Sequence, residues 1–276
     1  MRKIDSHQHF WKYHPEKDAW ISDDMKVIQR DFLPKDLEPL LKANHIDGCI
    51  AVQADQSEEE TYFLLQLATE NYFIKGVVGW VDLCGQNLES RLEHFAQFDK
   101  MKGFRHILQG EVDDNFVLTE DFCSGIAKLE KYNFTYDILI LPKHLAVAFE
   151  FVKKFPNQKF VIDHLAKPDF KNQEFSEWEK GIIKIATCPN VYCKVSGLVT
   201  EAGWNNWTES EFIHCLNFVT KAFGINRLLF GSDWPVCLLA ANYTQTLEIA
   251  ENYFSTFSET EQEKFWSGNT IKFYNL

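Results

Sequence analysis

The chain has 276 residues, 45% hydrophobic and 25% charged, a composition typical of a folded globular protein that excludes a disordered or fibrous one. Its formal net charge of −12 disfavours nucleic acid and anionic membrane surfaces as partners, because both are themselves negatively charged. No apolar run approaches the roughly 20 residues that span a bilayer, and the amino end lacks an apolar signal segment.

The seven cysteines are scattered singly, and none forms a Cys-x-x-Cys pair. An odd, dispersed set of this kind in a chain without a secretion signal indicates reduced thiols, most of them buried as small hydrophobic side chains. We therefore expect a cytoplasmic protein.

Short runs of β-branched and aromatic residues recur along the whole chain, separated by segments with helical periodicity. The predicted strands are Lys3–Ser6, Gly48–Gln53, Gly76–Val81, Gly103–Ile107, Thr135–Leu139, Lys159–Asp163, Val191–Val195 and Arg227–Phe230. The predicted helices are Leu37–Ala43, Glu59–Glu70, Leu88–Phe98, Phe122–Tyr132, Lys143–Phe155, Phe212–Phe223 and Ser258–Phe265.

The number and spacing of these elements predict an α/β fold. Eight units in 276 residues give 276/8 ≈ 34 residues per unit, close to the length of a βαβ unit. Strands that alternate with helices form a parallel sheet, and eight of them predict closure into a (β/α)₈ TIM barrel. No linker or low-complexity tract interrupts the pattern, so we expect a single domain, 1–276.

The segment Trp11–Val27 is longer than a usual connection between strand and helix. It carries Trp11, Tyr13, Pro15 and Trp20, and we expect it to fold over the mouth of the barrel. That end matters because functional residues of such barrels lie at the carboxyl ends of the strands.

His7 and His9 stand two positions apart at the first strand, so their side chains project from one face. Further polar side chains end other strands: Arg105 and His106, His164, and Asp233. In a closed barrel all of them point into one mouth. Imidazoles with one carboxylate suit zinc, iron or manganese, and an aspartate beside them is a natural general base for water.

A plainer interpretation exists for each of these residues. The histidine pair is also compatible with a buried hydrogen-bonded cluster, and Asp233 with a turn or a helix cap. Arg105 could pair with a structural carboxylate. The joint placement at strand ends favours the functional interpretation.

At these residues the chain resembles the amidohydrolase superfamily. More narrowly, it is similar to the branch with hydrolases of L-fuconolactone and L-rhamnonolactone and a pyrone-dicarboxylate lactonase. The motifs that carry the resemblance are Asp5-Ser-His-Gln-His-Phe-Trp11, Gly103-Phe-Arg-His106, Val161-Ile-Asp-His-Leu-Ala-Lys-Pro168, Lys194-Val-Ser-Gly197, Phe230-Gly-Ser-Asp-Trp-Pro235 and Gly268-Asn-Thr-Ile-Lys-Phe-Tyr274.

The resemblance implies hydrolysis of a lactone. Asp233 would take the proton from the attacking water, and His164 and Arg105 would stabilise the oxyanion. Superfamily members with two metals use a modified lysine or a glutamate on the fourth strand and a histidine on the fifth. This chain has Arg105 and His106 on the fourth strand and Asp137 on the fifth, so a two-metal centre is disfavoured.

Two forms of the site then remain open. One is a single divalent metal, zinc by preference, bound by His7, His9, His164 and Asp233. The other is a metal-free site, in which Arg105 and the histidines polarise the carbonyl.

Five further residues are candidates for substrate binding: Gln53, Trp80, His106, Lys194 and Trp204. Aromatic faces suit the rings of sugars, and the other three side chains suit hydroxyl groups. For both tryptophans, core packing is the alternative, and for Lys194 it is a salt bridge between strands.

Few cations stand at the strand ends, namely Arg105 with Lys167 and Lys194. A dicarboxylate substrate would need several arginines there, so we expect a neutral sugar lactone as the small-molecule partner. Whether the chain forms a homo-oligomer stays open.

Three classes of function follow: a lactone hydrolase, another superfamily enzyme such as a decarboxylase or an aromatic-dicarboxylate lactonase, and a catalytically inactive sugar-binding barrel. The absence of a Gly-x-Ser-x-Gly motif disfavours a covalent acyl-enzyme.

Overall fold

The computed structural model describes all residues, 1–276. Its eight strands form one parallel sheet in chain order, which confirms the predicted TIM barrel. The strands are β1 (Ile4–Gln8), β2 (Gly48–Val52), β3 (Ile74–Gly79), β4 (Met101–His106), β5 (Thr135–Ile138), β6 (Phe160–Ile162), β7 (Val191–Val195) and β8 (Leu228–Phe230).

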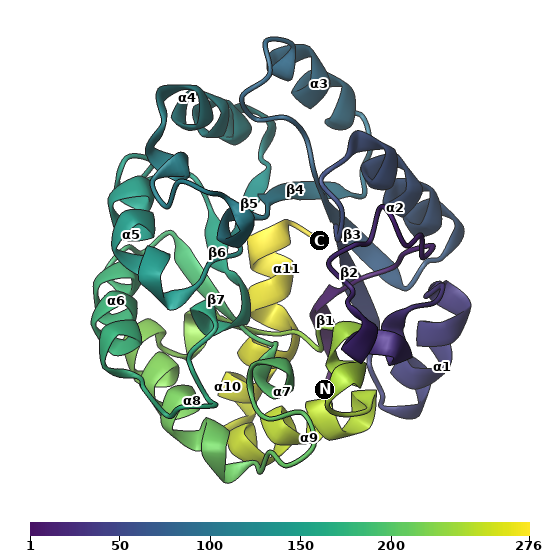
Figure 1. Cartoon of the computed structure of the whole chain (residues 1–276), viewed down its shortest axis with the longest axis vertical. Helices are drawn as coiled ribbons and strands as arrows, with labels where there is room; N and C mark the ends of the chain where they lie inside the picture. Colours follow the sequence, from purple (N-terminus) through teal and green to yellow (C-terminus); the bar gives the residue numbers. More distant parts are fainter.

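Apart from the last one, which crosses the centre of the view, the helices form a ring outside the strands (Figure 1). They are α1 (Pro34–Ala43), α2 (Glu58–Glu70), α3 (Leu88–Phe95), α4 (Glu120–Leu129), α5 (Leu145–Lys153), α6 (Ser176–Ala186), α7 (Leu198–Glu201), α8 (Ser210–Phe223), α9 (Tyr243–Phe254), α10 (Glu259–Glu263) and α11 (Asn269–Tyr274). The predicted helix Ser258–Phe265 is α10 and the start of a wider turn that leads into α11. Three helices, α6, α7 and α9, were not predicted, and α11 coincides with the motif Gly268–Tyr274 of the family resemblance.

The barrel is closed between its first and last strands. The backbone N–H of His9 donates to the Trp234 carbonyl at 2.7 Å, and that of Asp233 donates to the His7 carbonyl at 2.8 Å. β1 continues to Gln8, two residues past the predicted end at Ser6. His7 therefore lies within the strand.

Two hydrophobic clusters fill the fold. The larger one lies between the strands and the surrounding helices. The smaller one fills the barrel interior and includes Phe273 and Tyr274 of α11, the helix that crosses the centre of the view in Figure 1. The carboxyl-terminal helix thus closes one end of the barrel with aromatic side chains, which directs ligands to the other end.

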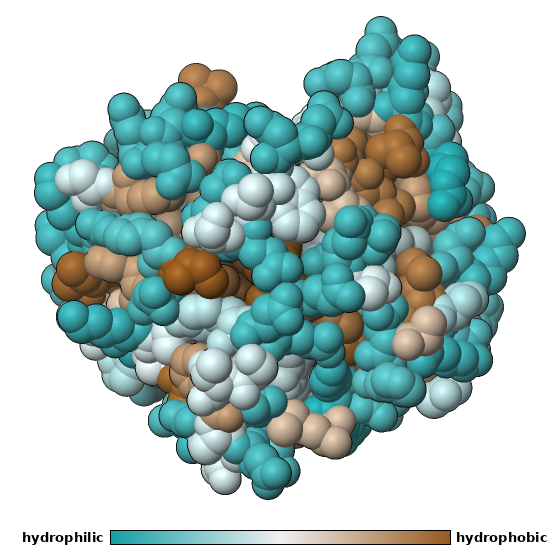
Figure 2. All heavy atoms as spheres, turned by 90° about the horizontal axis from the view of Figure 1, so that it is seen from below, coloured by the Kyte–Doolittle hydropathy of each residue, from teal (hydrophilic) through white to brown (hydrophobic).

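The long segment after β1 lies over the open end, as predicted. Trp11 pairs with Phe32 through two backbone hydrogen bonds of 3.0 and 2.9 Å, and Trp11, Trp20 and Met25 line a cavity there. On the face shown in Figure 2, apolar side chains form separate patches among hydrophilic ones. No helix is both long and apolar enough to cross a membrane.

Candidate active site

A cavity of about 430 Å³ opens at the carboxyl ends of the strands. Four polar side chains lie at its base: His9, Arg105, His164 and Asp233. Its walls are largely apolar and are formed by Trp11, Trp20, Met25, Ala54, Ile107, Leu139, Val236 and Leu239. A pocket of this size with a few convergent polar groups is the usual form of a small-molecule site.

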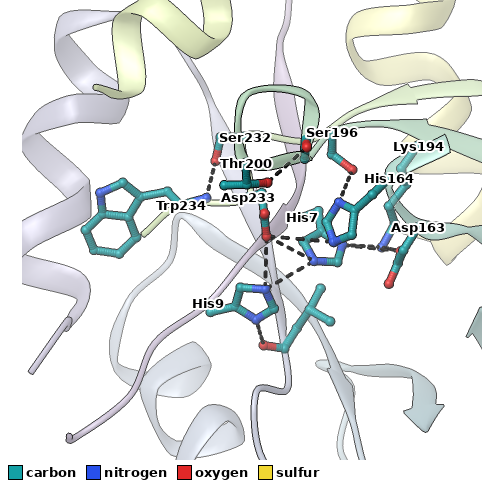
Figure 3. A network of polar contacts seen from close by, with 12 residues as sticks. His7, His9, Asp163, His164, Lys194, Ser196, Thr200, Ser232, Asp233 and Trp234 are labelled. Carbon is teal, nitrogen blue, oxygen red and sulfur yellow. Dashed lines mark hydrogen bonds and ion pairs between the residues drawn. The ribbon is translucent and has the colours of Figure 1, made fainter. Parts of the chain in front are cut away.

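Three imidazoles surround the carboxylate of Asp233 (Figure 3). Its Oδ1 lies 3.3 Å from His9 Nε2, 3.7 Å from His7 Nε2 and 3.8 Å from His164 Nε2. The Nε2 atoms of His7 and His9 are 3.2 Å apart. The two ends of the chain therefore meet where the sequence places its reactive side chains.

The turns that present His164 and Asp233 have an unusual backbone. The four residues from His164 to Lys167 have φ between 52° and 57°, and Asp233 has φ 57°. Residues other than glycine disfavour this left-handed region by about 1–2 kcal/mol each, and such residues cluster at functional sites. Close packing holds the first turn, because Gly197 lies against the His164 ring with no room for a Cβ.

Two of the histidines have a second partner at Nδ1. His9 Nδ1 donates to the Val52 carbonyl at 2.8 Å, and His164 Nδ1 is 2.8 Å from Ser196 Oγ, a hydroxyl that can accept or donate. These contacts direct both Nε2 atoms toward Asp233. Burial lowers the pKa of His164 to about 4, so this ring is neutral at pH 7.

Burial, reinforced by the nearby Lys194 ammonium, also holds the pKa of His7 well below its ordinary value. Asp233 behaves differently. Burial alone would raise the pKa of its carboxyl, but the positive charge that His164 gains at low pH, together with the nearby His9 and His7, outweighs it and holds that pKa below the ordinary value. The site therefore combines two neutral imidazoles, His7 and His164, with an ionised carboxylate.

This donor set fits a divalent metal ion. One ligand atom from each of His7, His164 and Asp233 lies within 4.8 Å of the other two. Ser196 orients His164 in the way that second partners usually orient metal-binding histidines. Three such donors leave a coordination position for water or substrate, as catalytic zinc sites do. His9 adds a fourth nitrogen beside Asp233.

Arg105 both pairs with structural groups and reaches the cavity. Its Nη1 donates to Asp163 Oδ2 at 3.0 Å, and its Nη2 donates to Gln53 Oε1 at 3.0 Å and to the Gln53 carbonyl. Its side chain is only 3% exposed. These bonds fix a guanidinium at the base of the cavity.

Of the five predicted substrate-binding residues, only Trp204 lines the cavity. Gln53 is fully buried behind Arg105. Trp80 Nε1 donates to His106 Nδ1 at 3.3 Å, and both side chains lie outside the cavity lining. The structure thus places none of these three side chains in the cavity lining.

Lys194, the fifth predicted substrate-binding residue, also lies outside the cavity lining. Its side chain is completely buried below the rim and is bonded to Asp137, Asp163 and His7. The period of a strand indicates which side chains enter the barrel but not how deep they lie. Lys194 therefore has the cross-strand salt bridges that were its alternative interpretation.

Three polar residues of the cavity lining were missed from the sequence: Gln109, Thr200 and Glu201. Glu201 pairs with Lys167 at 2.8 Å. The Gln109 Oε1 atom is buried and has no hydrogen-bond partner. Thr200 and Glu201 come shortly after Gly197 and the carboxyl end of β7. This position after a strand end is the feature from which they could have been predicted.

Comparison with known proteins finds a matching family and similar proteins from two bacteria. The family model described as amidohydrolase matches residues 4–276. An L-fucono-1,5-lactonase of Burkholderia multivorans is 40% identical, over 99% of this chain and 96% of the relative. An L-fucono-1,5-lactonase of Burkholderia ambifaria is 33% identical over the same shares.

A solved structure extends the similarity to three dimensions. An amidohydrolase from Burkholderia multivorans, crystallised with bound zinc, has a TM-score of 0.97 to this chain at 39% identity, and the alignment covers all of both chains.

Proposed function

The chain belongs to the amidohydrolase family, and from that membership we propose that it is a lactonase that hydrolyses the ester bond of a neutral sugar lactone. One observation carries the proposal: an ionised carboxylate, Asp233, stands among three histidines and Arg105 at the base of a cavity. The relatives named as L-fucono-1,5-lactonases support a 1,5- or 1,4-lactone of a deoxy sugar as the substrate.

The charges of the cavity support a neutral substrate. Arg105 is paired with Asp163 at 3.0 Å, and Lys167 is paired with Glu201 at 2.8 Å. No unpaired cation is left for a dicarboxylate, and the Glu201 carboxylate repels one. A carboxylate next to an ammonium suits vicinal hydroxyl groups, and the apolar wall suits the methyl group of a deoxy sugar.

In the proposed reaction, Asp233 removes a proton from water as its oxygen attacks the lactone carbonyl carbon. Arg105 stabilises the negative charge on the carbonyl oxygen, and His164 does so with its proton on Nε2, which the Ser196 hydroxyl permits by donating to Nδ1. Each important donor of this kind is worth roughly 3–4 kcal/mol. The bond between carbonyl carbon and ring oxygen then breaks, and the ring oxygen takes the proton from Asp233. The products are a free hydroxyl group and a carboxylic acid, which ionises and releases one proton to the solution.

We propose that His7, His9, His164 and Asp233 provide the ligands of one divalent metal, with zinc favoured by the structure of the zinc-bound relative. A metal held there would polarise the lactone carbonyl and make the attacking water more acidic. A metal-free route through Arg105 and the histidines is the alternative. We also propose that residues 1–276 act as one domain in the cytoplasm.

Proton release in a pH-stat tests the proposal. We expect hydrolysis of deoxy-sugar lactones, little reaction with a pyrone dicarboxylate, and a loss of at least about 100-fold in kcat for Asp233→Asn. Asp99→Asn is the control, because Asp99 is exposed and precedes β4 at the opposite end of the barrel. Full activity of Asp233→Asn would remove its assignment as the base.

The remaining arms separate the alternatives. Faster turnover of the dicarboxylate would indicate an aromatic-lactone enzyme. Binding of lactones without turnover would indicate an inactive sugar-binding barrel, and release of carbon dioxide from aromatic acids a decarboxylase. A rate that survives a chelator would leave the metal-free route.

A further inference from the structure

The ammonium group of Lys194 lies directly below His7 and has three polar partners. Its Nζ donates hydrogen bonds to Asp137 Oδ2 at 2.5 Å and to His7 Nδ1 at 3.0 Å, and it forms an ion pair with Asp163 Oδ1 at 2.9 Å. An ammonium has three N–H donors and no acceptor. In the hydrogen bond between Lys194 and His7, the Nδ1 atom of His7 must therefore accept.

The contacts of the Nε2 atom, on the opposite side of the His7 ring, lead to the same assignment, in which Nε2 carries the proton. Its Nε2 lies 3.2 Å from His9 Nε2. The Val52 carbonyl can only accept, so a neutral His9 carries its proton on Nδ1 and a lone pair on Nε2. If His7 Nε2 had no proton, the lone pairs of the two Nε2 atoms would face each other. A proton on His7 Nε2 instead makes a hydrogen bond to His9 Nε2.

Two contacts favour the other tautomer, and both are long. Asp163 Oδ1 could accept from His7 Nδ1 at 3.3 Å, and Arg105 Nη1 could donate to His7 Nε2 at 3.4 Å. Hydrogen bonds of these kinds usually span about 2.7–3.2 Å. The other tautomer would also direct an N–H at the Lys194 ammonium only 3.0 Å away.

We infer that Lys194 is a positioning residue, which fixes the proton of His7 on Nε2 by donating to Nδ1. His7 then acts as a donor toward His9 and Asp233. The same proton occupies the atom through which His7 would bind a metal, so Lys194 lowers the affinity of the site for a divalent cation. The inference does not depend on the substrate being a lactone.

Nitrogen NMR of the metal-free protein, labelled with ¹⁵N-histidine, tests the tautomer directly. We expect unprotonated Nδ1 and protonated Nε2 signals for His7, assigned by their loss in His7→Asn. A protonated Nδ1 in the wild-type protein would overturn the inference. This measurement needs no substrate and no activity, so its outcome is separate from that of the proposed function.

A double variant tests the role of Lys194 without leaving a buried charge unbalanced. The cluster has two carboxylates, Asp137 and Asp163, and two cations, Lys194 and Arg105. Lys194→Met with Asp137→Asn removes one charge of each sign. His7 Nδ1 then has only Asp163 as a partner, so we expect its proton to move to Nδ1.

Zinc affinity, measured by competition with a chelating dye, gives the second readout. We expect the double variant to bind zinc at least about tenfold more tightly. Because the net charge of the cluster is the same in both proteins, a difference in charge cannot explain this effect. Lys180→Met, which removes a cation paired with Glu177 on the exposed side of α6, should change the affinity less than threefold. An unchanged tautomer or an unchanged affinity in the folded double variant would contradict the inference, and if that variant does not fold, the wild-type spectrum decides.

Discussion

The Asp5 carboxylate accepts a hydrogen bond from the backbone N–H of Ser232 at 2.9 Å, although 227 residues separate the two. Its other oxygen accepts from the Tyr243 hydroxyl at 3.0 Å. Asp5 lies on β1, two residues before His7, and Ser232 directly precedes Asp233. This bond therefore ties together the two segments that carry the histidine pair and the carboxylate of the site.

The Asp5 carboxyl predicts a specific dependence of stability on pH. Burial raises its pKa from 3.8 to about 6, so the folded protein keeps a proton that the unfolded chain loses. The free energy of unfolding should therefore fall as the pH rises from about 4 to about 6, by about 2–3 kcal/mol from this group.

Asp5→Asn has no such titration. Urea unfolding of both proteins across this pH range, in the presence of a chelator, isolates the contribution of Asp5. Two stability curves that run parallel would show that Asp5 does not titrate in this way.

Much of the fold and part of the site follow from local signals in the sequence. Short strands that alternate with helices predict the barrel, and closure then requires that β1 and β8 be neighbours. For this reason the proximity of His7, His9 and Asp233 could be predicted. The helix α6 also had a readable signal, because Trp178, Ile182 and Ile185 follow helical spacing and are all buried.

The depth of side chains could not be predicted. Lys194 and Arg105 both belong to strands and both enter the barrel, yet Lys194 is fully buried and Arg105 reaches the cavity. The difference depends on how far each strand is shifted along its neighbours and on which buried acids are near. Glu201 was missed because its place on the cavity depends on the path of the chain after Gly197.

Ser196→Ala should weaken the site through His164. Ser196 Oγ is the only partner of His164 Nδ1, at 2.8 Å, and it fixes the ring with Nε2 toward Asp233. Loss of such a second partner typically reduces metal affinity or activity by about 10–100-fold. Zinc titration and kcat/KM measure the effect.

Ser6→Ala is a matched control for this change. Ser6 is also buried and also loses a hydrogen bond, in its case to the Phe230 carbonyl at 2.6 Å, but its hydroxyl touches no histidine. Equal losses of activity in the two variants would mean that Ser196 acts through stability alone.

Gly197→Ala should displace His164. A Cβ at this position would lie 2.7 Å from Cγ and Nδ1 of the His164 ring, and the residue has φ +66°. We expect kcat/KM to fall at least about 100-fold, since misplacing a reacting group by about 1 Å costs that much. Gly224→Ala separates the two effects, because Gly224 has φ +68° but no atom within 4 Å of its Cβ position. Both variants should lose stability, and only Gly197→Ala should lose activity.

Glu201→Gln should alter substrate selection more than turnover. Glu201 lines the cavity and is paired with Lys167 at 2.8 Å, so in the proposed function it accepts hydrogen bonds from lactone hydroxyls. A bond to a charged group is worth about 1.5–3 kcal/mol, which predicts a KM at least about tenfold higher with kcat changed less than threefold. The substitution also frees Lys167, so a dicarboxylate competitor should bind more tightly.

Glu177→Gln is the control, because Glu177 forms a similar pair with Lys180 at 2.6 Å on the exposed side of α6. If KM and the inhibition constant of the dicarboxylate both stay at their wild-type values, the Lys167–Glu201 pair does not select the substrate.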